Sequence, residues 1–475
     1  MATVLPVYPT TRRNVELLLV VLAVVIAGGA WAVVGLTADG ALPPNLLAYA
    51  GGLGGLAVLL HLLVRWKAKH ADPVLLPVAT LLNGIGLVMI HRLDLAEDST
   101  AASRQFLWSA LGMLAAGVVL WLVRDHRVLR RYTFTAMVVG LVLLLLPLVP
   151  GLGRTVNGAR IWVGIGPLSF QPGELAKIAL AIFFAGYLVV HRDALSLTGR
   201  KVLFLQLPRA RDLGPILLAW VAAIGILVLQ RDLGTSLLFF GLFVAVLYVS
   251  TERVSWIVLG LLLFAVAAVF AATTMGHVES RVEIWLHPFT AENRSGAGYQ
   301  LVQGLYGMAN GGLLGTGLDQ GRPDIVPYAN SDFIYSTIGE ELGLVGLFAV
   351  LMLYVLLVER GLRTAIAVRD GFGKLLAAGL AFSVTLQVFV VVGGVTRVIP
   401  LTGLTMPFLA AGGSSLVSNW IIVGLLLRVS DLARRPAAEV RNGPDRDDDN
   451  GPQRGDDNGP QRGDETGVTQ AVPVP

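Results

Sequence analysis

Two stretches, LLLVVLAVVIAGG at residues 17–29 and VLGLLLFAVAAVFAA at residues 258–272, consist of apolar side chains and glycine alone. A helix of roughly 20 such residues crosses the hydrocarbon core of a bilayer. Inside lipid, only helices and closed barrels pair all of their own backbone polar groups. Barrel strands alternate apolar and polar residues, whereas these stretches are continuous. They predict an all-α fold, a polytopic membrane bundle.

The rest of the chain continues this pattern. Of its 475 residues, 55% are hydrophobic and 14% are charged, whereas a soluble domain is about 25% charged. Similar apolar stretches predict about twelve spans, at residues 15–36, 45–66, 73–91, 104–123, 132–150, 174–190, 213–230, 234–250, 253–275, 339–358, 374–399 and 405–429. The sixth is short and carries Glu174 and Lys177 near its start, so we leave open whether it crosses fully.

Several chemical classes are excluded by what the chain lacks. It has no cysteine, which rules out disulfides, thiolate nucleophiles and cysteine metal sites. Its seven histidines are scattered without metal-ligand spacing. No GxxxxGK[ST] motif occurs, so a P-loop nucleotide site is not expected.

The distribution of Lys and Arg predicts the topology. With the N-terminus inside, nineteen of them fall in the inner loops and nine on the outer side and adjoining helix ends. Because basic loop residues favour the cytoplasmic side, both termini are expected to be cytoplasmic and the number of spans even. The membrane domain is predicted over 1–435.

Two segments differ from the spans. Residues 276–338 form a long external loop rich in glycine and aromatic residues, and loops of this length are uncommon unless they are functional or disordered. Its apolar content favours a re-entrant or surface-lying loop. Residues 436–475 carry the octapeptide DDNGPQRG at 448–455 and again at 456–463. Such a charged segment buries too little apolar surface to fold, so a disordered cytoplasmic tail is predicted.

Ionisable residues near or inside the spans are functional candidates, because they are costly in a bilayer and usually face a cavity or one another. Glu174 and Lys177 are three residues apart on one helix and are close enough to pair. They are either a self-neutralising structural pair or part of a cavity lining. Asp232 follows Gln230 and Arg231 at an external turn, where it suits a helix cap with or without contact to a ligand.

Further candidates lie toward the external side. Asp332 also stands at a capping position, and Glu340 and Glu341 follow it into an apolar span, either as helix-entry anchors or as site residues. Arg397 suits an anionic group, or it extends to the interface. The external loop offers four carboxylates as a general base, and spacing alone selects none of them: Glu283, Glu292, Asp319 and Asp324.

From the residues alone, two classes of function remain open. One is a membrane enzyme that acts on a lipid-linked substrate at the outer face. The other is a secondary transporter, which would show two repeated halves with interrupted helices. No convincing internal repeat is found, which favours the enzyme.

Five motifs, in order, resemble the SEDS family, the FtsW, RodA and SpoVE proteins of bacterial cell-wall synthesis. They are QPGELAK (171–177), QRDLGTS (230–236), GAGYQLVQGLYGMANGGLLGTGL (296–318), SDFIYSTIGEELGLVG (331–346) and IPLTGLTMPFLAAGGSS (399–415). The resemblance covers most of residues 130–430. The two leading helices, the basic inner loops and LLNGIGLVMIHRLDL (81–95) look like the longer RodA-type members of actinobacteria.

The resemblance implies a peptidoglycan glycosyltransferase of the plasma membrane. Such enzymes polymerise lipid II, an undecaprenyl-pyrophosphate-linked precursor, at the outer face and are paired with a class B penicillin-binding protein. A carboxylate would deprotonate the attacking sugar hydroxyl, while cations stabilise the pyrophosphate. No cofactor is implied with certainty, a divalent cation is left open, and no nucleic acid is expected as a partner.

Carried over residue by residue, the resemblance assigns a substrate-binding role to Glu174, Lys177, Asp232, Asp332, Arg397, Tyr299 and Gln300. The chain departs from the family at Gly173, where serine is usual, and at Arg231, where proline is usual. Tyr328 and Asn330 replace the Glu and His that often precede the DFI motif.

The largest departure lies in the external loop. The family typically reads LDPF-x-DP-x-G-x-GYQ there, and its second aspartate is the expected catalytic residue. Here the text is LHPFTAENRSGAGYQ (286–300), which places Asn293 or Ala291 at the aspartate, depending on the end from which one counts. Because asparagine is not a base, we predict that Glu292, the nearest carboxylate, acts instead; the alternative is a weakly active chain.

The favoured function is therefore glycan polymerisation in cell elongation and shape maintenance. The alternatives are an FtsW-type role in cell division, a lipid II flippase of the same fold, and a non-catalytic scaffold for a penicillin-binding protein.

Overall fold

The computed structural model describes residues 11–156, 158–165, 168–196, 201–202, 205–206 and 210–436. Its long helices are α1 (Arg13–Asp39), α2 (Leu46–Lys67), α3 (Leu75–Glu97), α4 (Ala101–Leu122), α5 (Thr133–Leu145), α6 (Pro172–Ser196), α7 (Ala210–Leu229), α8 (Leu233–Thr251), α9 (Ser255–Thr274), α13 (Ile334–Ala367), α14 (Gly371–Val395) and α15 (Gly413–Arg434). The shorter elements are η1 (His126–Tyr132), η2 (Leu146–Leu148), β1 (Gly153–Val156), β2 (Ala159–Ile165), β3 (Leu168–Phe170), β4 (Lys201–Val202), β5 (Leu205–Gln206), α10 (Gly276–Leu286), α11 (Ala291–Ser295), α12 (Tyr299–Gly311) and η3 (Pro323–Ile325).

The prediction of a polytopic helical fold is confirmed. Within the described ranges, eleven helices are long and apolar enough to cross a membrane. The sixth predicted span is one of them, because α6 continues for 25 residues instead of ending early. The predicted span 213–230 corresponds to α7, whose apolar stretch Leu217–Leu229 is shorter than the others. An even count of twelve, with both ends inside, therefore stays a prediction.

The last predicted span begins too early in the sequence. Helix α15 starts at Gly413 and not at residue 405, because residues 401–412 form an irregular segment. Pro407 cannot donate a backbone hydrogen bond to a helix, and the Thr405 carbonyl is bound by the side chain of Gln387. Most of the segment from Leu404 to Ala410 is buried in the protein as non-helical backbone.

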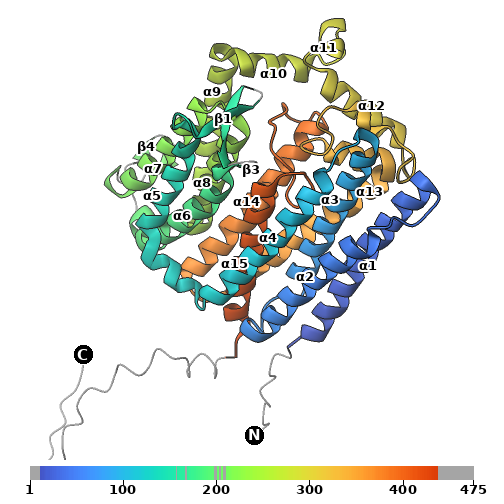
Figure 1. Ribbon diagram of the computed structural model, residues 1–475. Coiled ribbons are helices and arrows are strands. Elements are labelled where there is room, and N and C mark those ends of the chain that lie inside the picture. Colours follow the sequence, from blue (N-terminus) through green and yellow to red (C-terminus); the bar gives the residue numbers. More distant parts are fainter. Residues whose placement is uncertain are drawn as a thin grey trace, which may run out of the picture. The chain divides into compact units, whose positions relative to one another are not determined.

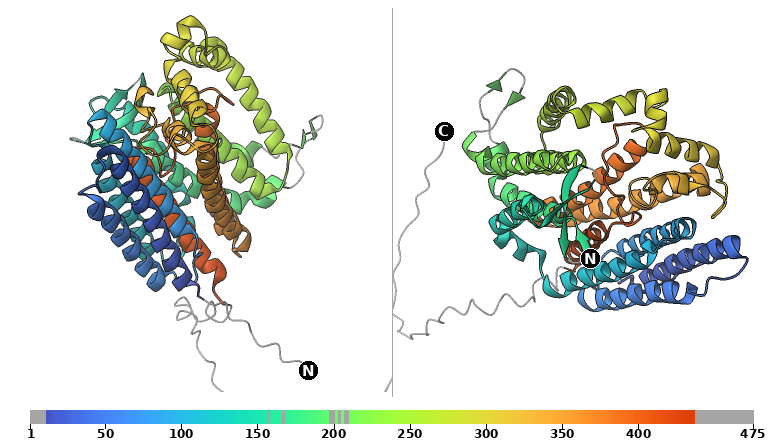
Figure 2. Two further views of the ribbon diagram at one scale, coloured as in Figure 1. Left: turned by 90° about the vertical axis from the view of Figure 1, so that its right-hand side faces the viewer. Right: turned by 45° about the horizontal axis from the view of Figure 1, so that its top comes forward.

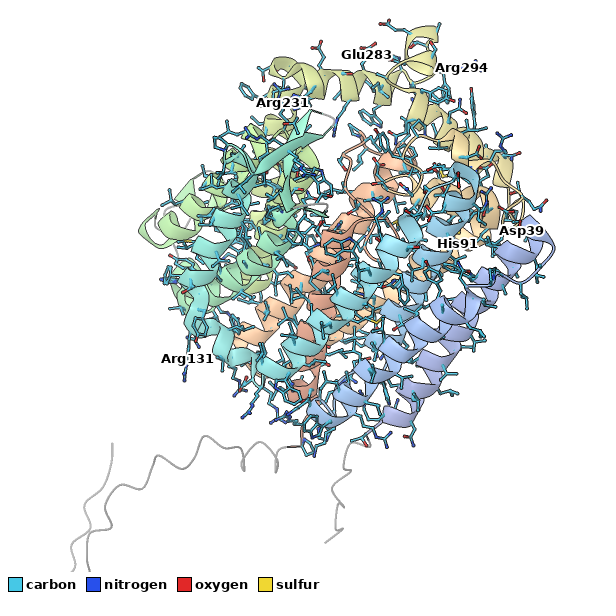
Figure 3. All side chains as sticks on the ribbon, in the orientation of Figure 1. Asp39, His91, Arg131, Arg231, Glu283 and Arg294 are labelled. Carbon is cyan, nitrogen blue, oxygen red and sulfur yellow. The ribbon has the colours of Figure 1, made fainter. Side chains whose placement is uncertain are left out.

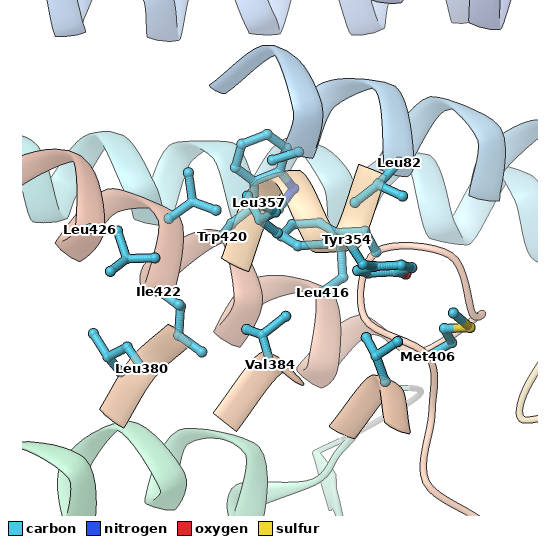
Figure 4. Packing of buried hydrophobic residues seen from close by; sticks show 14 of the residues in the cluster. Leu82, Tyr354, Leu357, Leu380, Val384, Met406, Leu416, Trp420, Ile422 and Leu426 are labelled. Carbon is cyan, nitrogen blue, oxygen red and sulfur yellow. The ribbon is translucent and has the colours of Figure 1, made fainter. Parts of the chain in front are cut away.

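The helices are arranged around α14 and α15 (Figure 1). Helix α15 packs on α4, α14 packs on α13 and α8, and α1 packs on α3. The core between them includes Tyr354, Val384 and Trp420, and the ring of Trp420 meets that of Phe408 edge-on at 5.6 Å (Figure 4). By contrast, few residues of α9 are buried, as expected for a helix that faces lipid.

Helices α1 and α2 are joined by a buried cluster of charged groups. Glu16 accepts from Arg13 at 2.6 Å and lies 2.7 Å from the Nδ1 atom of His61. Arg13 also donates to the Ala71 carbonyl, beyond the end of α2. The side chains of Glu16 and His61 are fully buried. Each therefore supplies the other's hydrogen-bond partner between the two helices.

The predicted external loop contains three helices of its own. Helices α10, α11 and α12 lie across one end of the spans, which both views in Figure 2 show. The loop is therefore ordered, while its place at the outer membrane surface stays a prediction.

The end of the loop is held at the start of α13 by a close backbone contact and by ion pairs. Gly343 interrupts α13 with φ 66° and ψ −167°, a conformation that favours glycine. A Cβ atom there would lie 2.3 Å from the nitrogen of Gly315, so no side chain fits. Nearby, Arg92 of α3 pairs with Glu341 at 2.7 Å and with Asp319 at 2.8 Å.

Glu340 and Glu341 therefore act as anchors, one of the two roles expected for them. Glu340 accepts from the backbone nitrogen of Arg322 at 2.9 Å, and Glu341 is fully buried against Arg92. Both carboxylates hold the glycine-rich loop.

A small antiparallel sheet, β1-β2-β3, lies between α5 and α6 and was not predicted. Its strands are short, and the mixture of Gly, Arg and apolar residues gives no clear alternation. The segment 437–475, nearly all of the predicted tail, lies outside the described residues.

Candidate active site

The pair predicted on the sixth span forms at the start of α6. Pro172 occupies the first turn, where its missing N–H costs nothing, and the next turns carry Glu174 and Lys177. The Lys177 ammonium lies 2.6 Å from Glu174 Oε2, and the two side chains are 1% and 5% exposed. The prediction that they pair is confirmed.

A polar residue of α14 completes this pair. Gln387 accepts from Lys177 at 2.9 Å through Oε1. Its amide group donates to the Thr405 carbonyl at 2.9 Å and lies 3.5 Å from Glu174 Oε1. The pair is thus connected to the irregular segment before α15. Gln387 was not among the predicted site residues, although a glutamine within an apolar span is a signal that could have indicated it.

Asp232 caps α8, which confirms one of the two roles predicted for it. Its carboxylate accepts from the backbone nitrogen of Thr235 at 2.9 Å, and the residue is 8% exposed. Burial raises the pKa of Asp232, while the hydrogen bond from Thr235 and the charge of Arg281 lower it. Glu174 is close enough to raise it further, so the cap and the α6 pair share one electrostatic environment.

Arg281 of α10 connects these groups to the external loop. It donates to the carbonyls of Leu401 at 3.1 Å and Thr402 at 3.0 Å. Burial lowers the pKa of Arg281, and the charges of Asp232 and Asp332 raise it. One guanidinium therefore interacts electrostatically with two carboxylates and holds the irregular segment at the same time.

Asp332 lies just before α13 but does not cap it. The residue preceding that helix is Phe333, and no side-chain cap is formed. Burial raises the pKa of Asp332 to about 6, although the charge of Arg281 and hydrogen bonds to the backbone lower it. A carboxylate that titrates near neutral pH is suited to exchange a proton.

The structure thus brings together five ionisable side chains, which we call the outer charge cluster: Glu174, Lys177, Asp232, Arg281 and Asp332. All of them except Arg281 were predicted from the sequence. In the described part of the chain, no group of three or more His, Cys, Asp or Glu side chains is arranged to hold a metal ion.

Glu292, the predicted base, lies elsewhere on the external loop. It is exposed in the first turn of α11, a short helix capped by Thr290. The neighbouring Asn293 is 7% exposed and donates to the His287 carbonyl at 2.9 Å. The asparagine is therefore used to hold the loop, and Glu292 is the carboxylate that this turn presents to solvent. No hydrogen bond or ion pair joins Glu292 to the outer charge cluster among the described side chains.

The remaining predicted site residues stabilise the loop in this structure. Arg397 donates to the carbonyls of Trp285 at 2.8 Å and Leu286 at 3.1 Å, at the C-terminal end of α10, where a cation is favourable. Gln300 donates to the Pro327 carbonyl at 2.7 Å. Tyr299 is half-buried at the start of α12.

Residues 73–435 match the family profile of FtsW, RodA and SpoVE, described as a cell cycle protein. This chain belongs to that family. With eleven apolar helices in its described part, the family member is a multi-pass protein of the bacterial plasma membrane.

Similar proteins agree with this membership. The peptidoglycan glycosyltransferase RodA of Mycobacterium tuberculosis is 49% identical over 433 residues, which are 90% of this chain and 92% of the relative. The crystal structure of RodA from Thermus thermophilus has 29% identity and a TM-score of 0.56, covering 77% of this chain and 98% of its own. A chain described under "Structural coordination of polymerization and crosslinking by a peptidoglycan synthase complex" has 30% identity and a TM-score of 0.62, with 76% and 97% covered.

The FtsW, RodA and SpoVE profile begins just before α3. Helices α1 and α2 thus precede the part of the chain that the profile matches, whereas the mycobacterial relative matches over 90% of the chain.

Proposed function

We propose that this chain is a peptidoglycan glycosyltransferase that polymerises lipid II into glycan strands during cell elongation. The observation that carries the proposal is the outer charge cluster, three of whose five side chains are buried (Glu174, Lys177 and Asp232), in a fold of the RodA type. The 49% identity to a mycobacterial peptidoglycan glycosyltransferase RodA supports the same activity.

The chemistry requires one proton transfer and one leaving anion. The 4-hydroxyl of an acceptor sugar attacks the anomeric carbon of the donor, and the bond from that carbon to the pyrophosphate oxygen breaks. We assign the hydroxyl proton to the carboxylate of Glu292. The leaving undecaprenyl pyrophosphate gains negative charge, which Lys177 and Arg281 would stabilise, because preorganised cations act strongly where charge develops.

A class B penicillin-binding protein is the proposed partner. The complex described above couples polymerisation with crosslinking, and a polymerase that makes uncrosslinked strands needs such a partner.

The experiment combines the purified chain, its partner transpeptidase and lipid II, with glycan strands separated on a gel. We expect wild-type protein to make polymer. If it makes none with a competent partner present, the flippase and scaffold alternatives gain support, and transfer of a dye-labelled lipid across vesicles would distinguish them.

Arg281 gives a prediction about the leaving group. Arg281→Gln removes a cation that interacts electrostatically with Asp232 and Asp332 and frees two backbone carbonyls, so polymerisation is expected to fall about 10- to 100-fold. Arg281→Lys should retain part of the rate. The matched control is Arg294→Gln, an exposed arginine on the same loop (Figure 3). Equal rates for the Arg281→Gln and Arg294→Gln proteins would contradict the role.

Asp332 gives a prediction about pH. If its ionised form is needed to hold Arg281, a pKa of about 6 predicts that polymerisation falls about tenfold between pH 7 and pH 5. The folded state then binds more protons than the unfolded state between roughly pH 4 and pH 6. Acidification through that window therefore adds stability from this group and does not remove it.

The measurement is a pair of pH profiles, one for polymer yield and one for thermal unfolding. Asp332→Asn should be slow and should lack the acid decline, whereas Asp324→Asn, a change in a carboxylate of the same loop, should behave like wild type. An unchanged acid decline in the Asp332→Asn protein would assign it to another group.

A further inference from the structure

A basic pocket lies at the end of the bundle opposite the external loop. It has a volume of about 380 Å³, and its polar lining comes from Arg127, Arg130, Arg131 and Asp370. Figure 3 shows Arg131 at this end, far from Arg231, Glu283 and Arg294. Because the distribution of basic residues predicts this end to be cytoplasmic, the pocket would open at the inner surface of the membrane.

Three elements of the fold build the pocket. The arginines stand on η1, the turn between α4 and α5, while α6 contributes Val189 and the start of α14 contributes Gly371 and Phe372. The ring of Phe372 stacks on that of His126 at 6.4 Å between centroids. The walls of the pocket are therefore set by packed helix ends.

The charge in the pocket is positive and mostly uncompensated. Asp370 is the one acidic lining residue, and it is already held by three groups: His126 Nε2 at 2.8 Å, the backbone nitrogen of Gly373 at 2.7 Å and Arg127 at 3.5 Å. Its pKa is lowered to about 2, because these contacts outweigh the effect of burial, so it carries its charge at neutral pH. Within the described ranges, Arg130 and Arg131 form no ion pair. Three guanidinium groups against one carboxylate leave a net charge of about +2.

Asp125 is the other carboxylate nearby, and it does not neutralise the free arginines. It accepts from the backbone nitrogen of Arg127 at 2.8 Å, where it caps η1. Its side chain is 38% exposed, and its closest ring nitrogen, on His126, is 3.9 Å away.

We propose that this pocket binds the phosphate group of an anionic phospholipid from the adjacent leaflet. Planar guanidinium groups match the geometry of phosphate oxygens, and basic pockets between spanning helices at the inner membrane surface suit such headgroups.

The surface beside the pocket favours a lipid over a free phosphate. Tyr132 and Phe134 follow the arginines directly, and they are 55% and 59% exposed. Phe134 lies 6.4 Å, ring to ring, from both Phe183 and Tyr187 of α6. Phe183 and Tyr187 are themselves buried, so they support the Phe134 ring from below. The exposed rings of Tyr132 and Phe134 thus lie where the cationic pocket ends, and they offer a place for the acyl chains of a bound lipid.

The test is a lipid titration of the purified full-length chain in detergent, followed by native mass spectrometry. Dioleoyl phosphatidylglycerol is the probe, and dioleoyl phosphatidylcholine is the neutral comparison. We expect the variant Arg130→Gln/Arg131→Gln to bind phosphatidylglycerol about 30-fold more weakly, because each surface cation contributes about 1 kcal/mol. This variant keeps the contacts of Asp370, and its thermal unfolding temperature verifies the fold.

Two matched variants sharpen the result. Arg130→Lys/Arg131→Lys keeps the charge but not the planar guanidinium groups, so its affinity should lie between those of wild type and the Arg130→Gln/Arg131→Gln protein. Arg12→Gln/Arg65→Gln removes two exposed arginines from the same end of the bundle and should bind like wild type. Equal affinity of wild type and the Arg130→Gln/Arg131→Gln protein would overturn the proposal, and so would an equal loss in the Arg12→Gln/Arg65→Gln protein.

Competition between inorganic phosphate and phosphatidylglycerol distinguishes a lipid site from a site for free phosphate. If inorganic phosphate does not displace phosphatidylglycerol at concentrations that match the total lipid, the site belongs to the lipid. Displacement at equal concentration would overturn the lipid assignment and identify a site for a soluble anion.

Discussion

Glu292→Gln is expected to lower the rate of glycan polymerisation about 100- to 10,000-fold, the range that a positioned general base contributes. The carboxylate stands exposed in the first turn of α11, and glutamine keeps its size and its capping environment while removing the base. The fold should be unaffected, because no hydrogen bond or ion pair of the Glu292 side chain is present among the described residues.

The control is Glu283→Gln, which changes another exposed carboxylate of the same loop (Figure 3). It should polymerise like wild type. A second variant, Asn293→Asp, returns the acid that the family pattern carries. The structure gives this position a structural task, since Asn293 donates to the His287 carbonyl, so the aspartate should weaken the loop. If Glu292→Gln makes as much polymer as wild type, the base is another carboxylate, and Asp332 is the first to examine.

Glu174→Ala is expected to destabilise the protein by about 3 to 5 kcal/mol, because it leaves the Lys177 ammonium buried without its carboxylate. Among the described residues, only the amide oxygen of Gln387 would remain as a partner of Lys177. The thermal unfolding temperature in detergent measures this loss. The comparison is Glu359→Ala, which removes a partner of the exposed Arg363 and should cost no more than about 1 kcal/mol.

A charge-neutral double variant separates stability from function. Glu174→Gln/Lys177→Met removes both buried charges and should recover most of the unfolding temperature. Polymerisation should stay lost, because the cation proposed for the pyrophosphate is absent. A stable double variant that polymerises at the wild-type rate would show that the pair is purely structural.

Much of the fold was predictable because lipid imposes a simple rule. Each span had to be an apolar run of sufficient length, and each of the eleven helices overlaps a predicted span. The largest difference in length is at α13, which runs from residue 334 to residue 367, whereas 339–358 was predicted. The start of α15 was missed because residues 401–412 are apolar enough for lipid but contain Pro407 and Gly403. Their backbone is satisfied by contacts such as that of Gln387 with Thr405, which sequence periodicity does not reveal.

The candidate site was predictable only where charge was out of place. Glu174, Lys177 and Asp232 stood out against apolar surroundings. Arg281 did not, because cations are common in external loops, and its acceptors, Leu401 and Thr402, are about 120 residues away in the chain. Helix α10 becomes part of the site through this one side chain.

The buried contacts between α1 and α2 have a consequence for how the chain enters the membrane. Alone, α1 would expose Glu16 and Arg13 to the translocation channel or to lipid without His61 and the Ala71 carbonyl. Arg13 and Glu16 still pair with each other within α1, but a buried charge pair that lacks its remaining hydrogen-bond partners is costly in a bilayer. The first helix therefore has an incomplete set of partners until the second has emerged from the ribosome. The two are therefore expected to insert together as a hairpin, and deletion of either one alone should leave the other poorly integrated during biogenesis.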